Sequence, residues 1–185
     1  PRVEPLIAAF IGRIDWGGPG PAYGKEEQAT AEIVARDVVP FVDARYPTRK
    51  DRAARAAVGT DLDAVAAAFA VFTHPTLFGG LGTHSMSLEE PWETELRQHV
   101  RTAASRPLRL YLDWGRYDRR STREAWDMRR ANQRFDTFLR GRGYRPAGGE
   151  VPEGAGWAGW RNRTDRVFEA LFPASPAEGA RAARP

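Results

Sequence analysis

The chain has 185 residues, of which 42% are hydrophobic and 28% charged, the composition of one soluble globular domain with a sizeable core. It contains no cysteine, which excludes disulfide bonds, thiolate metal sites and a cysteine nucleophile. No apolar run approaches the roughly 18 residues that a membrane helix needs, and no segment has the pattern of a signal peptide. We therefore expect no membrane partner, and the compartment stays open.

The net charge of +4 is carried almost entirely by arginine, because Lys25 and Lys50 are the only lysines. Arginine binds phosphate well, so nucleic acid is a partner class to consider. The arginines alternate with acids, however, as in "DRRSTREAWDMRRANQRFDTFLRGR" at 118–142. A mixed run of this kind is typical of a solvated helix face. The sequence therefore predicts no nucleic-acid partner.

Short apolar segments alternate with longer amphipathic ones along the chain. Strands are predicted at 5–11, 55–59, 79–85, 108–114 and 145–151. Helices are predicted at 25–46, 62–74, 92–104, 123–141 and 157–172; in the first, apolar residues recur at spacings of three and four. This alternation predicts the α/β class, with a mostly parallel sheet flanked by helices on both faces.

Residues 1–173 are expected to form one domain, and the Ala/Pro-rich end at 174–185 is expected to be a disordered tail. The opening "PRVEPLIAAFIG" reads as entry into a strand. We therefore expect part of a longer protein upstream of residue 1.

In a parallel sheet, ligands bind beyond the carboxyl ends of the strands. The residues that follow the predicted strands are therefore the candidates for a site. They are Asp15 and Trp16, 59–63, 84–87, 116–118 and 153–157.

Four stretches carry a resemblance to a known family. They are "EIVARDVVPFVDARYPT", "RAARAAVGTDLDAVAAAFAVFTHPTLFGGLGTHSMSL", "LRLYLDWGRYD" and "ANQRFDTFLRGRGYRPAGGEVPEGAGWAGWRNRTDRVFEALF". In this order they resemble the putative esterase family, related to esterase D and enterochelin esterase, within the α/β-hydrolase fold. The likeness covers about residues 3 to 173 and corresponds to the carboxyl-terminal two-thirds of such a hydrolase. The family's first strands, with one donor of its oxyanion hole, have no counterpart here.

The resemblance implies acyl transfer by serine, aspartate and histidine, with the serine in a Gly-x-Ser-x-Gly elbow between strand and helix. Here the elbow reads Gly-Thr-Asp-Leu-Asp: Asp61 stands at the nucleophile position and Asp63 at the second glycine. Asp118 matches the acid of the triad. Ala155 stands where the family has histidine, so the ordinary serine mechanism lacks both its nucleophile and its base.

Two functions from different classes follow from these replacements. The first is an esterase-like domain that has lost serine-hydrolase activity and acts as a binding or interaction module, beside an upstream domain or a partner chain. The alternative is an active hydrolase that uses Asp61 as nucleophile with an unconventional base such as His84, which lies at the end of the strand predicted at 79–85. Whether the chain is an enzyme stays open. We expect no cofactor and no metal, and the ligand and the oligomeric state stay open.

Other interpretations of the same residues stay open as well. Asp61 could cap the following helix, which we favour, or join Asp63 and Asp118 in an acidic cluster for a cation. The Asp-x-Asp at 61–63 also matches the haloacid-dehalogenase pattern, but both lysines lie upstream of it. Asp63, His84, Tyr117 and Trp157 are candidates for a pocket, although aromatic residues more often pack beneath loops.

Overall fold

The structure is a computed structural model that describes residues 2–174 apart from 13, 15–24, 103–106 and 123–125. The predicted tail at 174–185 therefore lies almost wholly outside the described residues, as do the candidates Asp15 and Trp16. Among the helices in the described ranges, none is long and apolar enough to cross a membrane.

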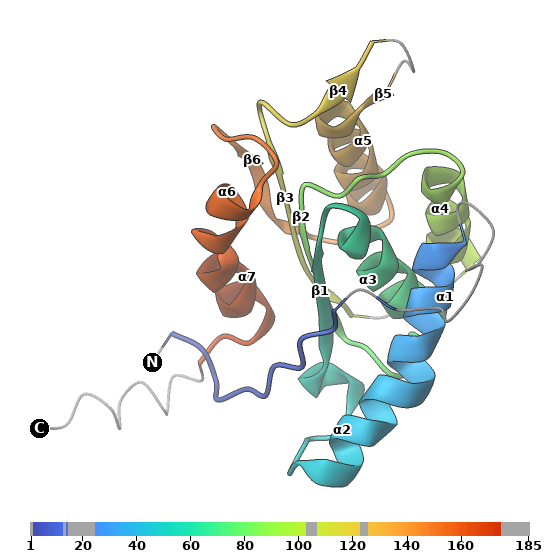
Figure 1. Ribbon diagram of the computed structural model, residues 1–185, viewed down its shortest axis with the longest axis vertical. Helices are drawn as coiled ribbons and strands as arrows, with labels where there is room; N and C mark the ends of the chain where they lie inside the picture. Colours follow the sequence, from blue (N-terminus) through green and yellow to red (C-terminus); the bar gives the residue numbers. More distant parts are fainter. Residues whose placement is uncertain (1, 13, 15–24, 103–106, 123–125, 175–185) are drawn as a thin grey trace, which may run out of the picture.

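Four parallel strands form the main sheet, in the order β1, β2, β3 and β6 (Figure 1). They are β1 (Ala56–Thr60), β2 (Gly80–His84), β3 (Arg109–Gly115) and β6 (Ala147–Val151). The register places Thr60, His84, Asp113 and Gly149 in one row across the sheet near its carboxyl edge. The α/β class and the parallel sheet predicted from the sequence are thus confirmed.

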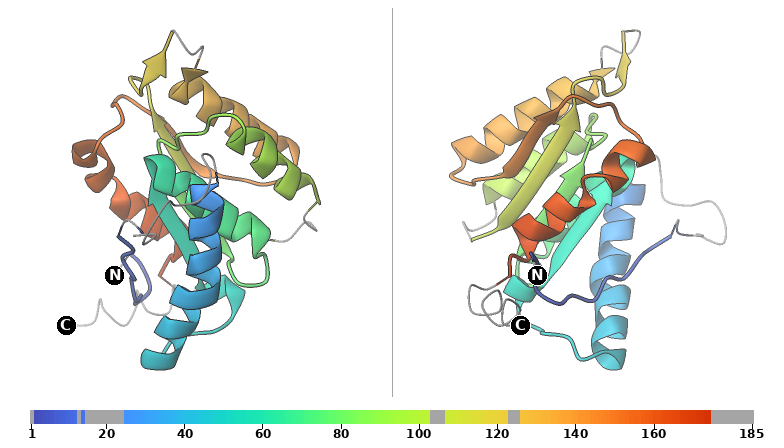
Figure 2. Two further views of the ribbon diagram at one scale, coloured as in Figure 1. Left: turned by 45° about the vertical axis from the view of Figure 1, so that its right-hand side comes forward. Right: turned by 90° about the vertical axis from the view of Figure 1, so that its left-hand side faces the viewer.

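Helices cover both faces of this sheet. One face carries α3 (Asp61–Thr73), α4 (Trp92–Thr102) and α5 (Met128–Gly141), and α1 (Glu26–Ile33) packs on α3. The other face carries α6 (Trp157–Arg161) and α7 (Thr164–Leu171), as the two views of Figure 2 show. The larger hydrophobic core lies on the α3 side, where α3 is buried from Ala64 to Phe72 because it is apolar on nearly every face.

Most predicted elements are present, with three differences in detail. The predicted helix 25–46 is α1, a π-helical turn at Val34–Val38 and α2 (Val39–Arg45). Pro40 explains the π turn, because it has no N–H for a bond to Arg36 and its ring crowds that carbonyl. The predicted helix 157–172 is interrupted between α6 and α7. A 3₁₀ turn at Arg52–Ala54 was not predicted, and neither was a short hairpin of β4 (Arg120–Ser121) with β5 (Trp126–Asp127). Strand β5 lies inside the predicted helix 123–141, whose described part, α5, begins at Met128.

The prediction of a strand at 5–11 is wrong. No residue of this segment belongs to the sheet, and residues 5 to 12 are all exposed. Only the preceding residues are paired, through a bridge between Val3 and Pro173 and a bond from the Glu4 amide to the Phe172 carbonyl of 3.0 Å. An apolar segment becomes a strand only where a neighbouring strand accepts its hydrogen bonds, and the described chain offers none beside it.

Candidate functional site

The turn between β1 and α3 has the geometry of a strand-to-helix elbow. Thr60 is extended, and the next residue, Asp61, has a φ of 57°, in the left-handed region that residues with a side chain rarely adopt. Helix α3 begins at Asp61 itself. A Cβ on Gly59 would overlap the Asp63 carbonyl, so glycine is required for the close approach of strand and helix. The elbow that the resemblance implied is therefore present in the backbone.

The Asp61 carboxylate is held by the Arg119 guanidinium, which contacts both of its oxygens. The two side chains are 28% and 56% exposed, so this is a surface pair at the mouth of the elbow. The N-cap of α3 is Thr60 and makes no side-chain cap bond, which differs from the capping role favoured for Asp61. Asp63 lies in the first turn of α3, where burial and the nearby Asp61 charge raise its pKa.

Asp118 follows β3 and is buried, with 7% of its surface exposed. Its Oδ1 accepts a hydrogen bond of 3.2 Å from the Ser85 hydroxyl, and its Oδ2 accepts one of 2.8 Å from the Gly115 amide. Burial raises the pKa of Asp118 despite these bonds. The position that matches the acid of the triad therefore carries a carboxyl group, but its side-chain donor is a serine hydroxyl.

The loop after β6 lies against the loop that carries Asp118. The Tyr117 amide donates to the Glu153 carbonyl at 2.9 Å, and a Cβ on Gly154 would come within 2.9 Å of the Tyr117 carbonyl. The backbone thus brings the segment of Ala155 to the loop after β3, as a triad requires. What stands at 155 is a methyl group, and the Tyr117 side chain is exposed.

His84, the candidate base, is buried at the end of β2 with 1% of its surface exposed. Its Nδ1 lies 2.9 Å from Asp113 Oδ1, and its ring meets the Tyr111 ring edge to face at 6.0 Å. Its Nε2 has no hydrogen-bond partner among the described residues. The structure therefore places His84 in the interior, bonded to a carboxylate of β3 rather than to Asp61.

Arg163, between α6 and α7, is a buried residue that the sequence analysis missed. It is 2% exposed, its Nε donates to Asp113 Oδ2 at 3.0 Å, and it also pairs with Glu153. Burial alone would raise the pKa of Asp113, but the bonds from His84 and Arg163 hold it below its usual value. Nothing in the sequence indicates this role, because an arginine in a segment read as one amphipathic helix is expected to face solvent.

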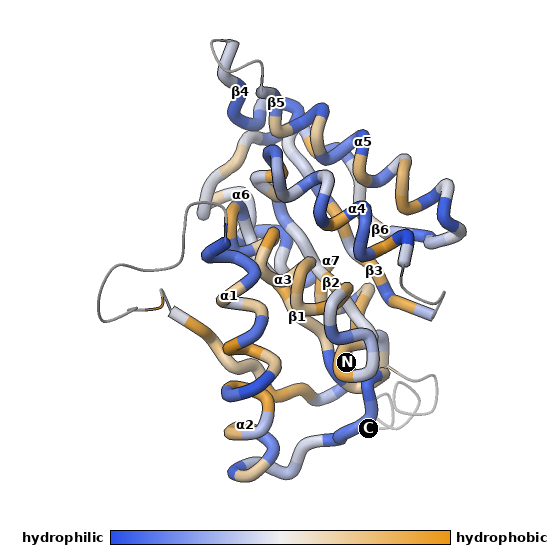
Figure 3. The backbone as a smooth tube through the Cα atoms, turned by 90° about the vertical axis from the view of Figure 1, so that its right-hand side faces the viewer, coloured by the Kyte–Doolittle hydropathy of each residue, from blue (hydrophilic) through white to orange (hydrophobic). Residues whose placement is uncertain are grey.

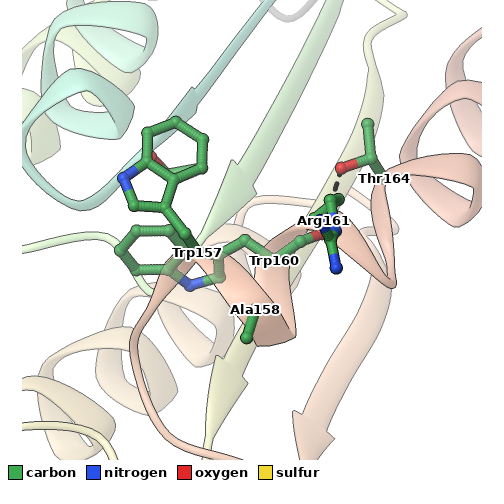
Figure 4. Close-up of a pocket in the computed structure, with 6 residues that line it drawn as sticks. Trp157, Ala158, Trp160, Arg161 and Thr164 are labelled. Carbon is green, nitrogen blue, oxygen red and sulfur yellow. Dashed lines mark hydrogen bonds between the residues drawn. The ribbon is translucent and has the colours of Figure 1, made fainter.

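A pocket of about 510 Å³ lies beside the end of β1 (Figure 4). Trp157 is 76% exposed there and meets Trp160 edge to face at 5.8 Å. The Trp160 indole donates to the Ser85 hydroxyl at 3.2 Å, which links this wall to Asp118. The pocket is lined by Thr60, Trp157, Ala158, Trp160, Arg161 and Thr164.

Of the four residues predicted for a pocket, Trp157 lines this one, and Asp63, His84 and Tyr117 do not. The acidic cluster is not assembled either: Asp61 pairs with Arg119, and Asp118 bonds Ser85 and Gly115. Within the described ranges, no group of three acidic or histidine side chains is arranged to hold a metal ion.

Solved structures of esterases share this fold. A ferulic acid esterase matches with a TM-score of 0.63 at 16% identity, over 76% of this chain and 60% of its own. Enterobactin esterase from Shigella flexneri matches with 0.64 at 18%, over 80% and 41%. Ferric enterobactin esterase from Salmonella typhimurium matches with 0.63 at 21%, over 80% and 39%. The chain thus spans between about two fifths and three fifths of these structures, and identities this low show the fold alone.

A search of curated proteins finds no match. A family model described as "Putative esterase" matches residues 14–170, which is most of the chain and includes the elbow, Asp118 and the loop after β6. This domain therefore belongs to the putative esterase family.

Proposed function

We propose that this domain does not hydrolyse esters by the serine mechanism and acts instead as a binding or interaction module built on the esterase fold. The observation that carries the proposal is the identity of the elbow residue: Asp61 stands at the tip, with its carboxylate held by Arg119. A hydroxyl activated by a histidine is what the serine mechanism requires, and neither group is present at these positions.

The surroundings of Asp118 support the proposal. In a triad the carboxylate orients an imidazole, whereas here Ser85 and the Gly115 amide occupy its two oxygens. The loop after β6 lies against the loop that carries Asp118, but the residue that matches the family's histidine is Ala155. The three histidines of the chain are His74, His84 and His99, none of which lies in this loop.

The arrangement around His84 argues against Asp61 as a nucleophile with His84 as base. A base for the hydrolysis of an ester intermediate must reach the attacking water. The His84 side chain is 2% exposed and is bonded to Asp113, which itself is fully buried. The charge of Asp61 is also partly neutralised by Arg119, which weakens it as a nucleophile.

A hydrolysis assay with a matched variant tests the proposal. Purified protein and its Asp61→Ala variant are incubated with 4-nitrophenyl acetate and 4-nitrophenyl butyrate, and both are treated with a fluorophosphonate probe that labels activated serines. We expect no turnover above buffer and no labelling for either protein, with circular dichroism confirming that both are folded. Turnover that disappears in the variant would establish Asp61 as catalytic and overturn the proposal. Turnover that persists in the variant would point to another site or to a contaminant, and labelling would place a reactive serine elsewhere in the domain.

A further inference from the structure

One arginine joins two separate parts of the chain. The Nε and Nη2 groups of Arg163 donate to the two oxygens of Asp113 in β3, at 3.0 and 3.3 Å, and its Nη1 pairs with the Glu153 carboxylate in the loop after β6. A planar guanidinium has donors on more than one side and can hold two carboxylates at once, whereas an ammonium group is a single point of charge. Arg163 therefore connects β3, the loop after β6 and the junction of α6 with α7.

The Asp113 end of this connection is fixed in the interior of the sheet. Asp113 is fully buried, its Oδ1 also lies 2.9 Å from His84 Nδ1, and its Oδ2 accepts a hydrogen bond of 2.9 Å from the Tyr111 hydroxyl. Each oxygen is thus held by Arg163 and by one further side chain from a central strand. This anchor does not depend on what covers the surface of the domain, because all four residues are buried.

The Glu153 end holds the loop after β6 and, through it, helix α6. Two further bonds attach this region to the rest of the domain: the Tyr117 amide donates to the Glu153 carbonyl at 2.9 Å, and the Trp160 indole donates to the Ser85 hydroxyl at 3.2 Å. Both are bonds between neutral groups, whereas the pair of Glu153 with the buried Arg163 is charge-assisted, which is the stronger kind. Of these three attachments, we therefore expect the ion pair to contribute most.

The backbone of α6 leaves room for this ion pair at Gly159. A Cβ at this position would overlap the Glu153 carboxylate and come within 3.0 Å of Arg163 Nη1. Glycine is unfavourable inside a helix relative to alanine, so a glycine in the middle of the five-residue α6 requires a reason. The close approach of the ion pair to the helix backbone supplies that reason.

We propose that Arg163 is the positioning residue of the loop after β6 and of α6, which it holds against β3 through Glu153 and Asp113. In a serine hydrolase, a histidine on this loop bonds the triad acid and thereby joins the two parts. With Ala155 at that position, no such bond forms, and the ion pair supplies a connection that needs no catalytic group. Because α6 carries Trp157 and Trp160, the same connection sets where both indoles lie. It holds whether or not the domain hydrolyses esters.

Amide hydrogen exchange measured by mass spectrometry tests the connection. Glu153→Ala should make the amides of 154–161 exchange about tenfold faster, while 62–73 of α3, which is mostly hydrophobic (Figure 3) and buried, should keep its rate. Glu153→Gln retains an oxygen that accepts a bond from Arg163 and should restore part of the protection. Asp136→Ala, which removes an ion pair on α5, is the control and should leave 154–161 unchanged. Equal rates in Glu153→Ala and the natural chain would overturn the proposal, and so would equal acceleration in 62–73, because the effect would then be a general loss of stability.

A second variant reaches the same ion pair from the helix. In an ordinary helix, alanine in place of glycine is stabilising and slows exchange. In Gly159→Ala the new methyl group displaces the Glu153 carboxylate, which is the movable end of a side chain, so the fold is kept while the connection is lost. We therefore expect faster exchange in 154–161, and no further acceleration when Gly159→Ala is combined with Glu153→Ala, because both remove the same interaction. Slower exchange in Gly159→Ala than in the natural chain, or additive effects of the two substitutions, would overturn the proposal.

Discussion

Two carboxylate–guanidinium pairs lie near the carboxyl edge of the sheet, and they differ in almost every respect. Asp113 and Arg163 are 0% and 2% exposed and share their network with His84 and Tyr111. Asp61 and Arg119 are 28% and 56% exposed. A buried pair is costly to break because an unpaired charge is left in the interior, whereas an exposed pair contributes little.

This difference explains how an esterase fold can carry Asp61 at its elbow. The backbone of the elbow is fixed by β1, α3 and the close approach at Gly59, and none of these depends on the side chain at 61. The tip residue faces solvent and can be exchanged without disturbing the core. The residue at position 61 can therefore be replaced while the fold persists, whereas replacement of the buried Asp113 would destabilise the fold.

The largest expected effect comes from breaking the buried pair. Asp113→Ala leaves the Arg163 guanidinium in the interior without its main partner, and the expected loss in the free energy of unfolding is about 3–5 kcal/mol. Urea denaturation followed by tryptophan fluorescence measures it. Arg49→Ala, which removes an exposed pair with Glu4, is the control and should stay within about 0.5 kcal/mol of the natural chain. A loss of less than about 1 kcal/mol for Asp113→Ala would contradict the comparison.

A smaller effect is expected from crowding the elbow. In Gly59→Ala the new methyl group meets the Asp63 carbonyl and the Ala64 amide, both of which are backbone atoms that cannot rotate away. The expected loss is about 1–3 kcal/mol. Gly141→Ala is the matched control, since nothing lies within 4 Å of its Cβ position. Equal stability of the two variants in urea would show that strand and helix are less tightly apposed at the elbow.

The architecture and the elbow could be predicted from the sequence, because both depend on local patterns. The alternation of apolar strands with amphipathic helices gave the parallel sheet, and "VGTDLDAV" marked the passage from β1 to α3. The positions of Asp118 and of the Ala155 segment followed from the rule that strand ends meet at one edge. The strands, the helices and the strand ends need only spacing along the chain, whereas the elbow and the matches of Asp118 and Ala155 to triad positions came from the family resemblance.

The buried network of Asp113, Arg163 and His84 could not be predicted in this way, and neither could the position of residues 5–11 outside the sheet. Arg163 lies in a stretch that reads as an exposed helix face, and its burial depends on Asp113, fifty residues earlier. His84 was expected at an accessible edge, but its ring turns to the same carboxylate. Residues 5–11 have the composition of a strand, yet strand formation requires a partner that composition does not specify.

The next prediction isolates the backbone strain at the elbow tip. Asp61→Gly and Asp61→Ala both remove the pair with Arg119, but only glycine adopts a φ of 57° without steric cost. Asp61→Gly should therefore be the more stable of the two by about 1 kcal/mol in urea denaturation. Because both variants lose the same carboxylate, the ion pair cancels in this difference. If Asp61→Ala is equally stable, the tip is not held in the left-handed conformation in solution.

The smallest expected effect concerns the pH dependence that Asp118 contributes. Burial raises its folded pKa above the ordinary value of 3.8, so its carboxyl group stabilises the fold most below that value. This contribution is lost as the pH rises through the folded pKa. The natural chain should therefore lose stability relative to Asp118→Asn as the pH rises from about 3.5 to 7, measured by urea denaturation at each pH. Asp43→Asn is the control with the opposite sign, because hydrogen bonds from Thr48 and Arg55 lower the pKa of Asp43, whose contribution is lost as the pH falls. If the stability of the natural chain relative to each of the two variants changed with pH in the same direction, Asp118 would not be held in a buried site. The contrast between the buried carboxylates and the exposed elbow would then not extend to Asp118.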